Sequence, residues 1–479
     1  MSKKKQPRRS ALEPHETHPS TPAPGALSAA AGDSSSYLPD AYTPRSGNPD
    51  ILVEHYALEV DYRLASNRLS GRAVLRGRML ANSTVITLDL VGLGVDKVSV
   101  NGSRPARFAT REGKLVITLK QPLGAGEQVS LDIRYSGNPR PRRSRWGAIG
   151  WEELTDGVLV AGQPIGAATW FPCNDHPSNK ATFDISITTD ADYRPVSNGE
   201  LVSRTRVARG ETWVYRVDEP MATYLATVQI GRYADTPLDD RTDVPIRVAA
   251  PAALATAAEW ALVDQRAMMD AFTEMFGPYP FARYTVVVAE DPLEIPLEAQ
   301  SLSLLGTNHL GRDWESQRLI AHELSHQWFG NAVTAGAWRD IWLHEGFACY
   351  AEWLWSESSG STTAVQRALG AWDLLSQQPQ DIIVGDPGPA DMFDDRVYKR
   401  GALAVQALRS WLGDEPFFDV LRSWVRTFQY QSVSTEDLCA LIDNHVSEDV
   451  RSGRAAMDVL RPWLYERDLP PSELLAVQK

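Results

Sequence analysis

The feature that most constrains the fold is a change of hydrophobic period near residue 244. Between about 50 and 240, apolar and polar residues alternate in short runs, such as the run from His55 to Val60, and Asn-Gly pairs at 101–102 and 198–199 mark turns. Alternation of period two is the pattern of half-buried strands. The sequence therefore predicts an N-terminal all-β, sandwich-like domain over residues 45–243.

After residue 244 the apolar spacing becomes that of helices, and only two buried strands are predicted, over 284–288 and 301–305. The predicted helices cover residues 252–276, 314–329, 340–356, 397–412, 415–430 and 435–445. A mixed sheet followed by helices is typical of an α+β domain. We therefore expect a multidomain chain in which residues 244–479 form a second, α+β domain.

Residues 1–44 differ in composition from both predicted domains. They combine basic residues with Pro, Ser, Ala and Gly and contain almost no large apolar side chains, which predicts a disordered tail. Glu13, Pro14 and Glu16 interrupt the place where a signal peptide would need an apolar segment. We therefore expect a cytoplasmic protein rather than a secreted one.

The overall composition argues against several classes of protein. No run in the chain approaches the ~18 consecutive apolar residues that a membrane-spanning helix needs. With 48 basic and 61 acidic residues the net charge is −13, which disfavours a nucleic-acid partner. Cys173, Cys349 and Cys439 are too few and too scattered for a disulfide framework, so we expect three buried thiols. A soluble enzyme is the class that remains favoured.

The pattern that carries chemistry is His-Glu-Leu-Ser-His at residues 322–326, inside a helix predicted from about 313 to 330. Residues four apart share a helix face, so His322 and His326 can bind one ion while Glu323 reaches a water beside it. Glu345 follows His326 after eighteen residues, on the next predicted helix. Two antiparallel helices would bring its carboxylate over the histidines, as in thermolysin, and leave the fourth position of one Zn²⁺ open for water.

Two neighbouring residues were weighed as competing ligands. One residue of helix turns His344 away from the face of Glu345, so a supporting or packing role is expected for it. Glu352 lies two turns beyond Glu345 on the same face, where a salt bridge is expected rather than ligation. The alternative for the whole pattern is a pair of core histidines with a surface glutamate.

These motifs resemble a known family. The segment 322–331, the Glu-Gly-Phe-Ala run at Glu345, the Phe-Pro-Cys-Asn-Asp-His-Pro block at 171–177 and the Tyr-Lys-Arg-Gly run at Tyr398 are similar to those of the zinc aminopeptidase family of aminopeptidase N and the leukotriene-epoxide hydrolase. The resemblance covers about residues 50–470. It implies a thermolysin-like catalytic domain over 244–479 and a catalytic role for Tyr398.

The resemblance also implies how the substrate's amino group is held. The segment 296–303 aligns with the family's Gly-Ala-Met-Glu-Asn strand, which makes Glu298 the amine anchor, and Gln163 looks like the β-domain glutamine that assists it. The segment departs from the family pattern at Ile295 and Ala299, which stand where the family has Gly and Asn.

The chain end also resembles one form of the family. Only nine residues follow Leu469-Pro470, which predicts a short form without the C-terminal helical domain. Without that domain, the cleft would be more open, or a second subunit would supply the missing wall.

The predicted function is therefore a zinc aminopeptidase acting on peptides with a free N-terminus. Glu323 would be the general base, Tyr398 would donate to the oxyanion, and Glu298 with Gln163 would bind the amine. Three alternatives remain open at this point. They are an endopeptidase of thermolysin type, which has no need of Glu298, an epoxide hydrolase on the same metal, and a peptide-binding or scaffolding protein with a relict zinc site.

Overall fold

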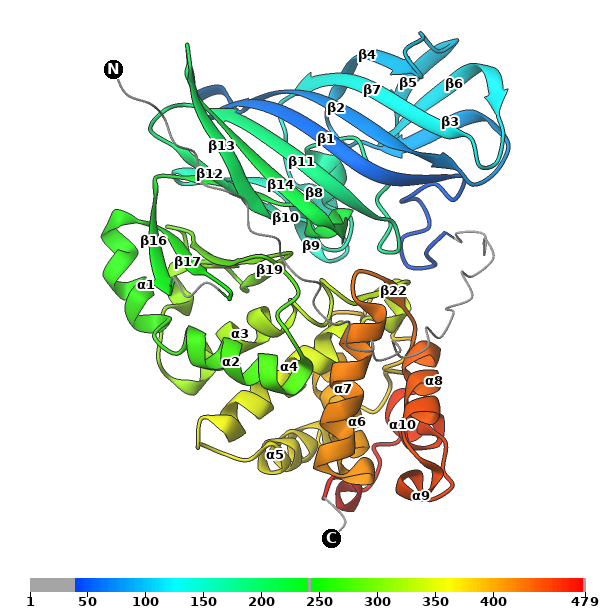
Figure 1. Ribbon diagram of the computed structural model, residues 1–479, viewed down its shortest axis with the longest axis vertical. Helices are drawn as coiled ribbons and strands as arrows, with labels where there is room; N and C mark the ends of the chain where they lie inside the picture. Colours follow the sequence, from blue (N-terminus) through cyan, green and yellow to red (C-terminus); the bar gives the residue numbers. More distant parts are fainter. Residues whose placement is uncertain (1–38, 240–242, 477–479) are drawn as a thin grey trace, which may run out of the picture. The chain divides into compact units, whose positions relative to one another are not determined.

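The computed structural model describes residues 39–239 and 243–476 (Figure 1). The tail predicted over 1–44 lies outside the described residues as far as residue 38. Residues 39–44 instead pack against the second domain. Asp40 is buried and its Oδ2 accepts a hydrogen bond from the backbone N–H of Trp338 at 2.8 Å, and the Oη of Tyr42 accepts one from Gly388 at 2.7 Å. The first of these bonds joins residues 298 positions apart, so no local sequence pattern could have announced it.

In the described part of the N-terminal half, the regular elements are strands and short 3-10 helices. The strands are β1 (Ile51–Arg63), β2 (Arg68–Met79), β3 (Ser83–Asp89), β4 (Gly94–Val100), β5 (Arg107–Arg111), β6 (Lys114–Leu123), β7 (Gln128–Gly137), β8 (Arg142–Ser144), β9 (Gly147–Leu154), β10 (Gly157–Ala161), β11 (Lys180–Thr189), β12 (Arg194–Ser197), β13 (Glu200–Val207), β14 (Gly210–Ala222) and β15 (Val228–Gly231). They form a seven-stranded sheet in the order β13-β14-β11-β1-β2-β7-β4, a five-stranded sheet in the order β12-β15-β10-β9-β8, and a three-stranded sheet in the order β3-β6-β5.

The alternating sequence explains why these strands form and pack. Along β11 every second side chain is buried, among them Phe183 and Ile187, while the side chains between them remain half-buried. The buried face of the seven-stranded sheet lies against the five-stranded sheet, where the ring of Tyr62 on β1 meets the ring of Trp151 on β9 at 4.8 Å. The prediction of an N-terminal all-β, sandwich-like domain is confirmed.

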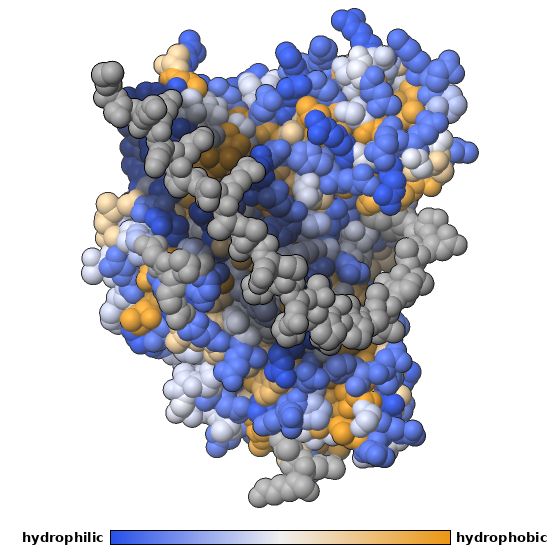
Figure 2. All heavy atoms as spheres, viewed as in Figure 1, coloured by the Kyte–Doolittle hydropathy of each residue, from blue (hydrophilic) through white to orange (hydrophobic). Residues whose placement is uncertain are grey.

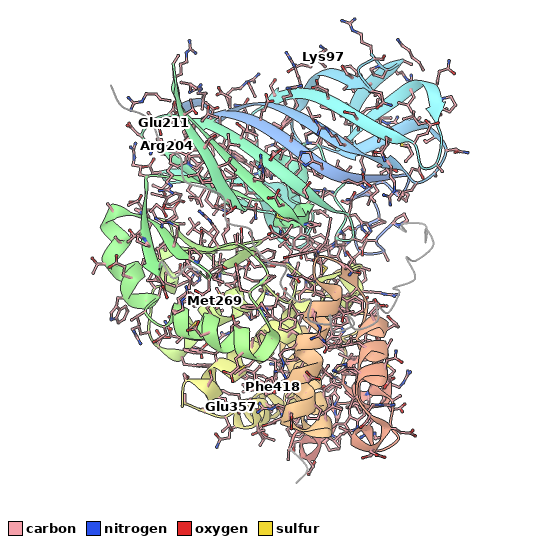
Figure 3. All side chains as sticks on the ribbon, in the orientation of Figure 1. Lys97, Arg204, Glu211, Met269, Glu357 and Phe418 are labelled. Carbon is pink, nitrogen blue, oxygen red and sulfur yellow. The ribbon has the colours of Figure 1, made fainter. Side chains whose placement is uncertain are left out.

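Charged side chains protect the exposed edge of the large sheet. Figure 3 shows Arg204 and Glu211 side by side near one end of β13 and β14, and the Nε of Arg204 donates a hydrogen bond to Glu211 at 2.6 Å. The same guanidinium lies 4.4 Å from the centre of the Trp213 ring. Charges on an edge strand oppose pairing with another chain. Hydrophilic residues predominate over the face shown in Figure 2, with hydrophobic residues in small groups between them.

A second five-stranded sheet begins the C-terminal half of the chain. Its strands are β16 (Tyr233–Asp239), β17 (Ile246–Pro251), β18 (Tyr284–Val288), β19 (Leu297–Ala299) and β20 (Leu302–Leu305), in the order β16-β17-β18-β20-β19. The inner pairs are parallel and the two outer pairs are antiparallel, so the sheet is mixed, as expected. Its first strand begins at Tyr233, inside the range 45–243 predicted for the β domain. The very short strand β19 lies at the far edge.

Helices follow, as predicted. They are α1 (Ala255–Ala261), α2 (Gln265–Phe276), α3 (Trp314–Ser325), α4 (Trp342–Ser358), α5 (Ala364–Ser376), α6 (Asp395–Leu412), α7 (Asp414–Phe428), α8 (Thr435–His445), α9 (Glu448–Arg451) and α10 (Ala456–Leu464), with a short parallel pair of strands, β21 (Thr334–Ala335) and β22 (Ser432–Val433). The order of β domain and α+β domain along the chain is therefore the one predicted.

The single helix predicted over 252–276 is wrong in one respect, because a turn divides it into α1 and α2. Leu262 is buried at the end of α1, whereas the neighbouring Val263 is 55% exposed and Asp264 binds Arg312 at 2.7 Å. Because the exposed Val263 is apolar, it continues the hydrophobic pattern of a helix. The turn between α1 and α2 therefore could not be predicted from that pattern.

Two expectations drawn from composition can be compared with the structure. None of the helices in residues 39–239 and 243–476 is long and apolar enough to cross a membrane. Cys173, Cys349 and Cys439 are free and buried, which confirms the prediction of three buried thiols.

Candidate active site

Helix α3 carries the two histidines of the central motif. Asp313 caps its first turn by accepting a hydrogen bond from the N–H of Ser316 at 3.1 Å. The helix ends at Ser325, earlier than predicted, but His326 keeps helical dihedral angles, with φ −56° and ψ −22°. The spacing of four therefore still brings the imidazoles together, with ring centres 4.7 Å apart.

A glycine makes the tight turn after His326 possible. Gly330 has a φ of +115°, and a side-chain Cβ there would lie 3.2 Å from Nδ1 of His326 and 3.5 Å from His344. The left-handed conformation and the close imidazoles both favour glycine at this position.

Glu345 joins the histidines from the first turn of α4. Its Oε2 lies 3.4 Å from Nε2 of His322 and 3.5 Å from Nε2 of His326. Zinc binds nitrogen and oxygen at about 2.0–2.2 Å in a tetrahedron, which places neighbouring ligand atoms roughly 3.3–3.5 Å apart. The spacing and the donor types of these three residues therefore fit one zinc ion.

The histidines are oriented by bonds on their far sides. Nδ1 of His322 lies 2.9 Å from Oε1 of Glu352, whose other oxygen accepts a bond from Arg318 at 3.3 Å. Nδ1 of His326 lies 3.0 Å from the carbonyl oxygen of Phe329. Such partners direct Nε2 of each ring toward a metal. Glu352 thus has the supporting salt-bridge position that the sequence predicted.

His344 points elsewhere. Its Nε2 accepts a hydrogen bond from the backbone N–H of Ala335 at 2.7 Å, and burial lowers its pKa to about 3. It is a neutral packing residue, as expected, and not a member of the ligand group.

The charges of the three grouped residues depend on one another. Burial opposes a charge on His322 and His326. Glu345 and Glu352 nevertheless raise the pKa of His322 to about 10 by accepting hydrogen bonds from its ring, and Glu345 and Glu298 raise the pKa of His326 to about 9. Burial alone would raise the pKa of Glu345, yet the two imidazoles hold it well below its usual range. A cation bound in place of the imidazole protons would lie next to the ionised carboxylate of Glu345.

Two further carboxylates lie at the same place. Carboxylate oxygens of Glu298 and Glu323 and one ring nitrogen of His326 all lie within 4.8 Å of one another. Glu323 is buried, and its Oε2 has no hydrogen-bond partner within the described part of the chain. Burial, and then the neighbouring Glu298, raise the pKa of Glu323 to about 8, and burial also raises that of Glu298. The geometry offers a free carboxylate oxygen for a small polar molecule and a second carboxylate beside it.

Tyr398 lies in the first turn of α6. Its ring stacks on that of His322, with centres 6.1 Å apart and an angle of 16° between the planes. Burial raises its pKa well above the usual value, so the phenol keeps its proton as a hydrogen-bond donor.

Gln163 lies in the β domain, in the loop after β10. Its Nε2 is buried and has no partner in the described ranges, an arrangement that native proteins usually avoid. The loop packs closely on Tyr224, whose carbonyl oxygen would lie 2.2 Å from a Cβ at Gly162. Burial raises the pKa of the Tyr224 phenol, and Glu298 and Glu345 add to the rise. Gln163 makes no hydrogen bond to the other predicted residues, whereas the structure brings those six together.

Three residues with contacts to the site were not identified as such from the sequence. The Oη of Tyr224 donates to Gly330 at 3.2 Å, and the side-chain amides of Gln327 and Asn331 donate to the strand of Glu298. Gln327 and Asn331 lie within the motif at 322–331, but spacing along the chain carries no signal of a contact with residue 299.

Comparison with known proteins gives two family matches. Residues 52–225 match the Peptidase M1 N-terminal domain and residues 260–458 match the Peptidase family M1 domain. Aminopeptidase M1-D of Oryza sativa subsp. japonica is 27% identical over 463 residues, which are 90% of this chain and 51% of that protein. Aminopeptidase N of Oryctolagus cuniculus is 27% identical over 409 residues, or 78% of this chain and 42% of that protein. The chain therefore spans about half the length of the curated relatives it matches.

Solved structures are similar over more of their length. The M1 zinc metallopeptidase from Deinococcus radiodurans is 31% identical with a TM-score of 0.80, and the match covers 91% of this chain and 98% of that one. A mutant of that enzyme bound to a Tyr-Ser-Ala substrate has a TM-score of 0.82 with the same coverage.

Proposed function

Because the chain belongs to peptidase family M1, we propose that it is a zinc-dependent aminopeptidase that removes the N-terminal residue from peptides with a free amino group. The observation that carries this proposal is the position of Glu298. Its carboxyl group lies within 4.8 Å of Glu323 and His326, so an acidic side chain stands beside the metal site without being one of its three proposed ligands. An endopeptidase has no need of such a charge, whereas the ammonium group of an N-terminal residue would pair with it.

His322, His326 and Glu345 are the proposed zinc ligands, one ion per chain. When bound there, zinc supplies Lewis-acid activation of water and of the substrate carbonyl. Glu352 and the carbonyl of Phe329 hold the two imidazoles in the orientation that this requires, because they bind the nitrogens that face away from the metal.

Glu323 is the proposed general base. Its unpartnered Oε2 faces no competing protein donor in residues 39–239 and 243–476. A cation held by the neighbouring ligands would lower the pKa that burial raises, and the ionised carboxylate could then take a proton from the attacking water. The same carboxyl then gives that proton to the leaving amine. Glu323 lies outside the group of His322, His326 and Glu345, although with Glu298 and His326 it forms a second group of possible ligand atoms. We assign the ion to the first group, which leaves Glu323 free for proton transfer.

Tyr398 and the amine anchors complete the proposed machinery. The protonated phenol of Tyr398 donates a hydrogen bond to the oxyanion. Glu298 binds the substrate ammonium and Gln163 assists with its free amide. The amine is separated from the reacting carbonyl carbon only by Cα, so fixing one fixes the other.

The substrates we propose are peptides with an unblocked N-terminus, in agreement with the names of the relatives and with the Tyr-Ser-Ala complex of the Deinococcus enzyme. We also propose a cytoplasmic location. The three free cysteines fit a reducing compartment.

The decisive experiment compares free and N-acetylated forms of one peptide on wild type and on Glu298→Ala. Removing one partner of a buried charge pair costs ~2 to 5 kcal/mol. At about 1.4 kcal/mol per tenfold, kcat/KM on the free peptide should fall by roughly 30-fold to several thousand-fold. Wild type should barely cleave the acetylated form, since acetylation removes the charge.

Glu294→Ala is the matched control, because Glu294 is an exposed glutamate in the loop that precedes the strand of Glu298. It should leave kcat/KM within about twofold, as expected for a solvated surface residue. Equal cleavage of free and acetylated peptide by wild type would instead favour an endopeptidase.

A further inference from the structure

The strand that carries Glu298 is held weakly by its own sheet. Strand β19 has three residues, lies at the sheet edge and pairs with β20 through Leu297, Glu298 and Ala299. A strand this short has few ladder hydrogen bonds to fix its position. The location of the Glu298 carboxylate must therefore depend on contacts from outside the sheet.

Two side chains from the loop after α3 supply such contacts. The Nε2 of Gln327 and the Nδ2 of Asn331 each donate a hydrogen bond to the carbonyl oxygen of Ala299, both at 3.1 Å. Both side chains are fully buried. Ala299 directly follows Glu298, so these bonds hold the backbone next to the proposed amine anchor.

The oxygens of these two side-chain amides have different partners. The Oε1 of Gln327 accepts a bond from the N–H of Ser301 at 2.8 Å, so one side chain spans both ends of the turn from β19 to β20. The Oδ1 of Asn331 has no partner within the described residues, which leaves the donation to Ala299 as the hydrogen bond its side chain makes. Burying an unpaired amide oxygen costs free energy of folding. The hydrogen bond from Asn331 to Ala299 is the interaction of this side chain that offsets the cost.

The loop that supplies these amides also carries the metal site. Gln327 directly follows His326, and the N–H of Asn331 donates to the carbonyl of His326 at 3.0 Å. From the β domain, Nζ of Lys180 donates to the carbonyls of Asn331 and Ala332 at 3.0 and 2.8 Å. The loop is thus fixed on one side to the β domain and on the other to the strand of Glu298.

We propose that Gln327 and Asn331 are positioning residues that set the distance between the Glu298 carboxylate and the metal site, and so determine how strongly the enzyme recognises a free amino group. This proposal rests on the proposed function. The competing explanation makes them core amides that only stabilise the fold.

The test uses two zinc-binding probes on the zinc-loaded, full-length protein. L-leucine hydroxamate has an ammonium group, and 4-methylpentanohydroxamic acid is the same molecule without it. Calorimetric Kd values for both give a ratio that reports the grip on the ammonium independently of metal binding. Zinc content and Tm are measured on every variant.

Gln327→Met and Asn331→Ala should reduce this ratio by ~10-fold or more, because a displacement of about 1 Å suffices for effects of this size. The loss should appear in the Kd of L-leucine hydroxamate, with zinc content and the Kd of the deaminated probe unchanged. Gln406→Met is the matched control. Gln406 is also a fully buried glutamine with three polar contacts, to Tyr350, Ser410 and Leu475, but it is two turns beyond Tyr398 on α6.

The outcomes separate the two proposals. A ratio unchanged in Gln327→Met and Asn331→Ala, or reduced equally in Gln406→Met, overturns the positioning role. If Glu298→Ala itself leaves the ratio unchanged, the proposed amine anchor fails. Should Gln327→Met not fold, Asn331→Ala decides alone, because it removes only one donor.

Discussion

Two buried clusters of polar residues, one in each half of the chain, each contain a carboxyl group with a shifted pKa, and the shifts of Glu345 and Asp175 have opposite directions. In the active site, Glu345 lies within 3.5 Å of two imidazoles, which hold its pKa well below the usual range. In the β domain, Asp175 accepts a bond from the hydroxyl of Thr223 at 2.8 Å and has no cation within hydrogen-bond distance among the described residues. Burial, and then the charge of Asp89, raise its pKa to about 7.

Burial raises the pKa of both carboxyls, and only the imidazoles beside Glu345 reverse that effect, so the charge of the neighbouring groups decides the direction of the shift. Asp89 is tied to the β domain by Gly47 at 2.8 Å, by the N–H of Asp175 at 3.2 Å and by Lys114 at 2.6 Å. These bonds satisfy both oxygens of Asp89. Oδ2 of Asp175 and Oε2 of Glu323 both lack a hydrogen-bond partner among the described residues, so an unpaired oxygen does not distinguish the two clusters. They differ in their cationic neighbours: two imidazoles lie beside Glu345, whereas the hydrogen bond to Asp175 comes from a neutral hydroxyl.

The largest effect expected from this contrast is on Glu323→Gln. The substitution keeps the shape and removes the base, so kcat should fall by ~10²- to 10⁴-fold while zinc remains bound. Metal analysis and steady-state kinetics measure the two quantities. The corresponding change in the other cluster, Asp89→Asn, should lower Tm and leave kcat of the folded protein within about twofold. Stoichiometric zinc missing from wild type, with activity resistant to chelators, would refute the metal assignment.

Tyr398→Phe should have the next largest effect. It removes one hydroxyl and little packing, so KM and Tm should change little while kcat falls by ~10²- to 10³-fold. The comparison is with Tyr135→Phe in the β domain, whose buried hydroxyl has no partner in the described ranges. Tyr135→Phe should leave kcat unchanged, and any change in Tm should be an increase. A near wild-type kcat for Tyr398→Phe would make this residue a core tyrosine.

Glu352→Gln probes the support of a metal ligand. It weakens the bond to Nδ1 of His322, and losses of such partners typically cost 10- to 100-fold in metal affinity. Chelator competition measures the zinc Kd. Glu357→Gln is the control on the same helix, because Glu357 lies near the far end of α4, about three turns after Glu345, where it binds Arg409 at 2.9 Å. Equal zinc affinity in the two variants would argue against a role for Glu352.

The sequence predicted those site residues whose spacing along the chain places them on one face of a helix or on the next helix. His322 and His326 are four residues apart, and the second helix brings Glu345 to them. The family resemblance that added Tyr398 and Glu298 is confirmed by the match to peptidase family M1. Each of these signals is local or shared by relatives.

What the sequence did not predict depends on contacts between distant segments. Asp40 meets Trp338 across the chain, and Asn331 meets Ala299 through one amide. Neither pair has a spacing that a periodic pattern could encode. The exposed Val263 hid a helix break for the opposite reason, because it follows the hydrophobic pattern without being buried.

Asp175→Asn should have the smallest effect on catalysis. It is also the sharpest test of the β-domain cluster. Folding raises the pKa of this carboxyl from about 3.9, its unfolded value, to about 7. The folded protein therefore binds a proton that the unfolded chain has released, so this residue's contribution to stability is full below pH ~4 and is lost as pH rises through 7. The three-unit shift corresponds to an upper limit on the order of 4 kcal/mol at alkaline pH.

The substitution removes this pH dependence, because the amide keeps the acceptor for Thr223 and cannot ionise. Thermal unfolding at pH 5 and pH 8 should show Asp175→Asn gaining several °C relative to wild type between the two pH values, with kcat within about twofold. Asp132→Asn is the contrasting control, since its half-exposed carboxylate pairs with Arg72 at 3.1 Å and Arg72 lowers its pKa. Its Tm relative to wild type should not rise between pH 5 and pH 8. A difference between Asp175→Asn and wild type that is the same at both pH values would mean that Asp175 is ionised in the folded protein, like Glu345, and the two clusters would then not differ in the way described.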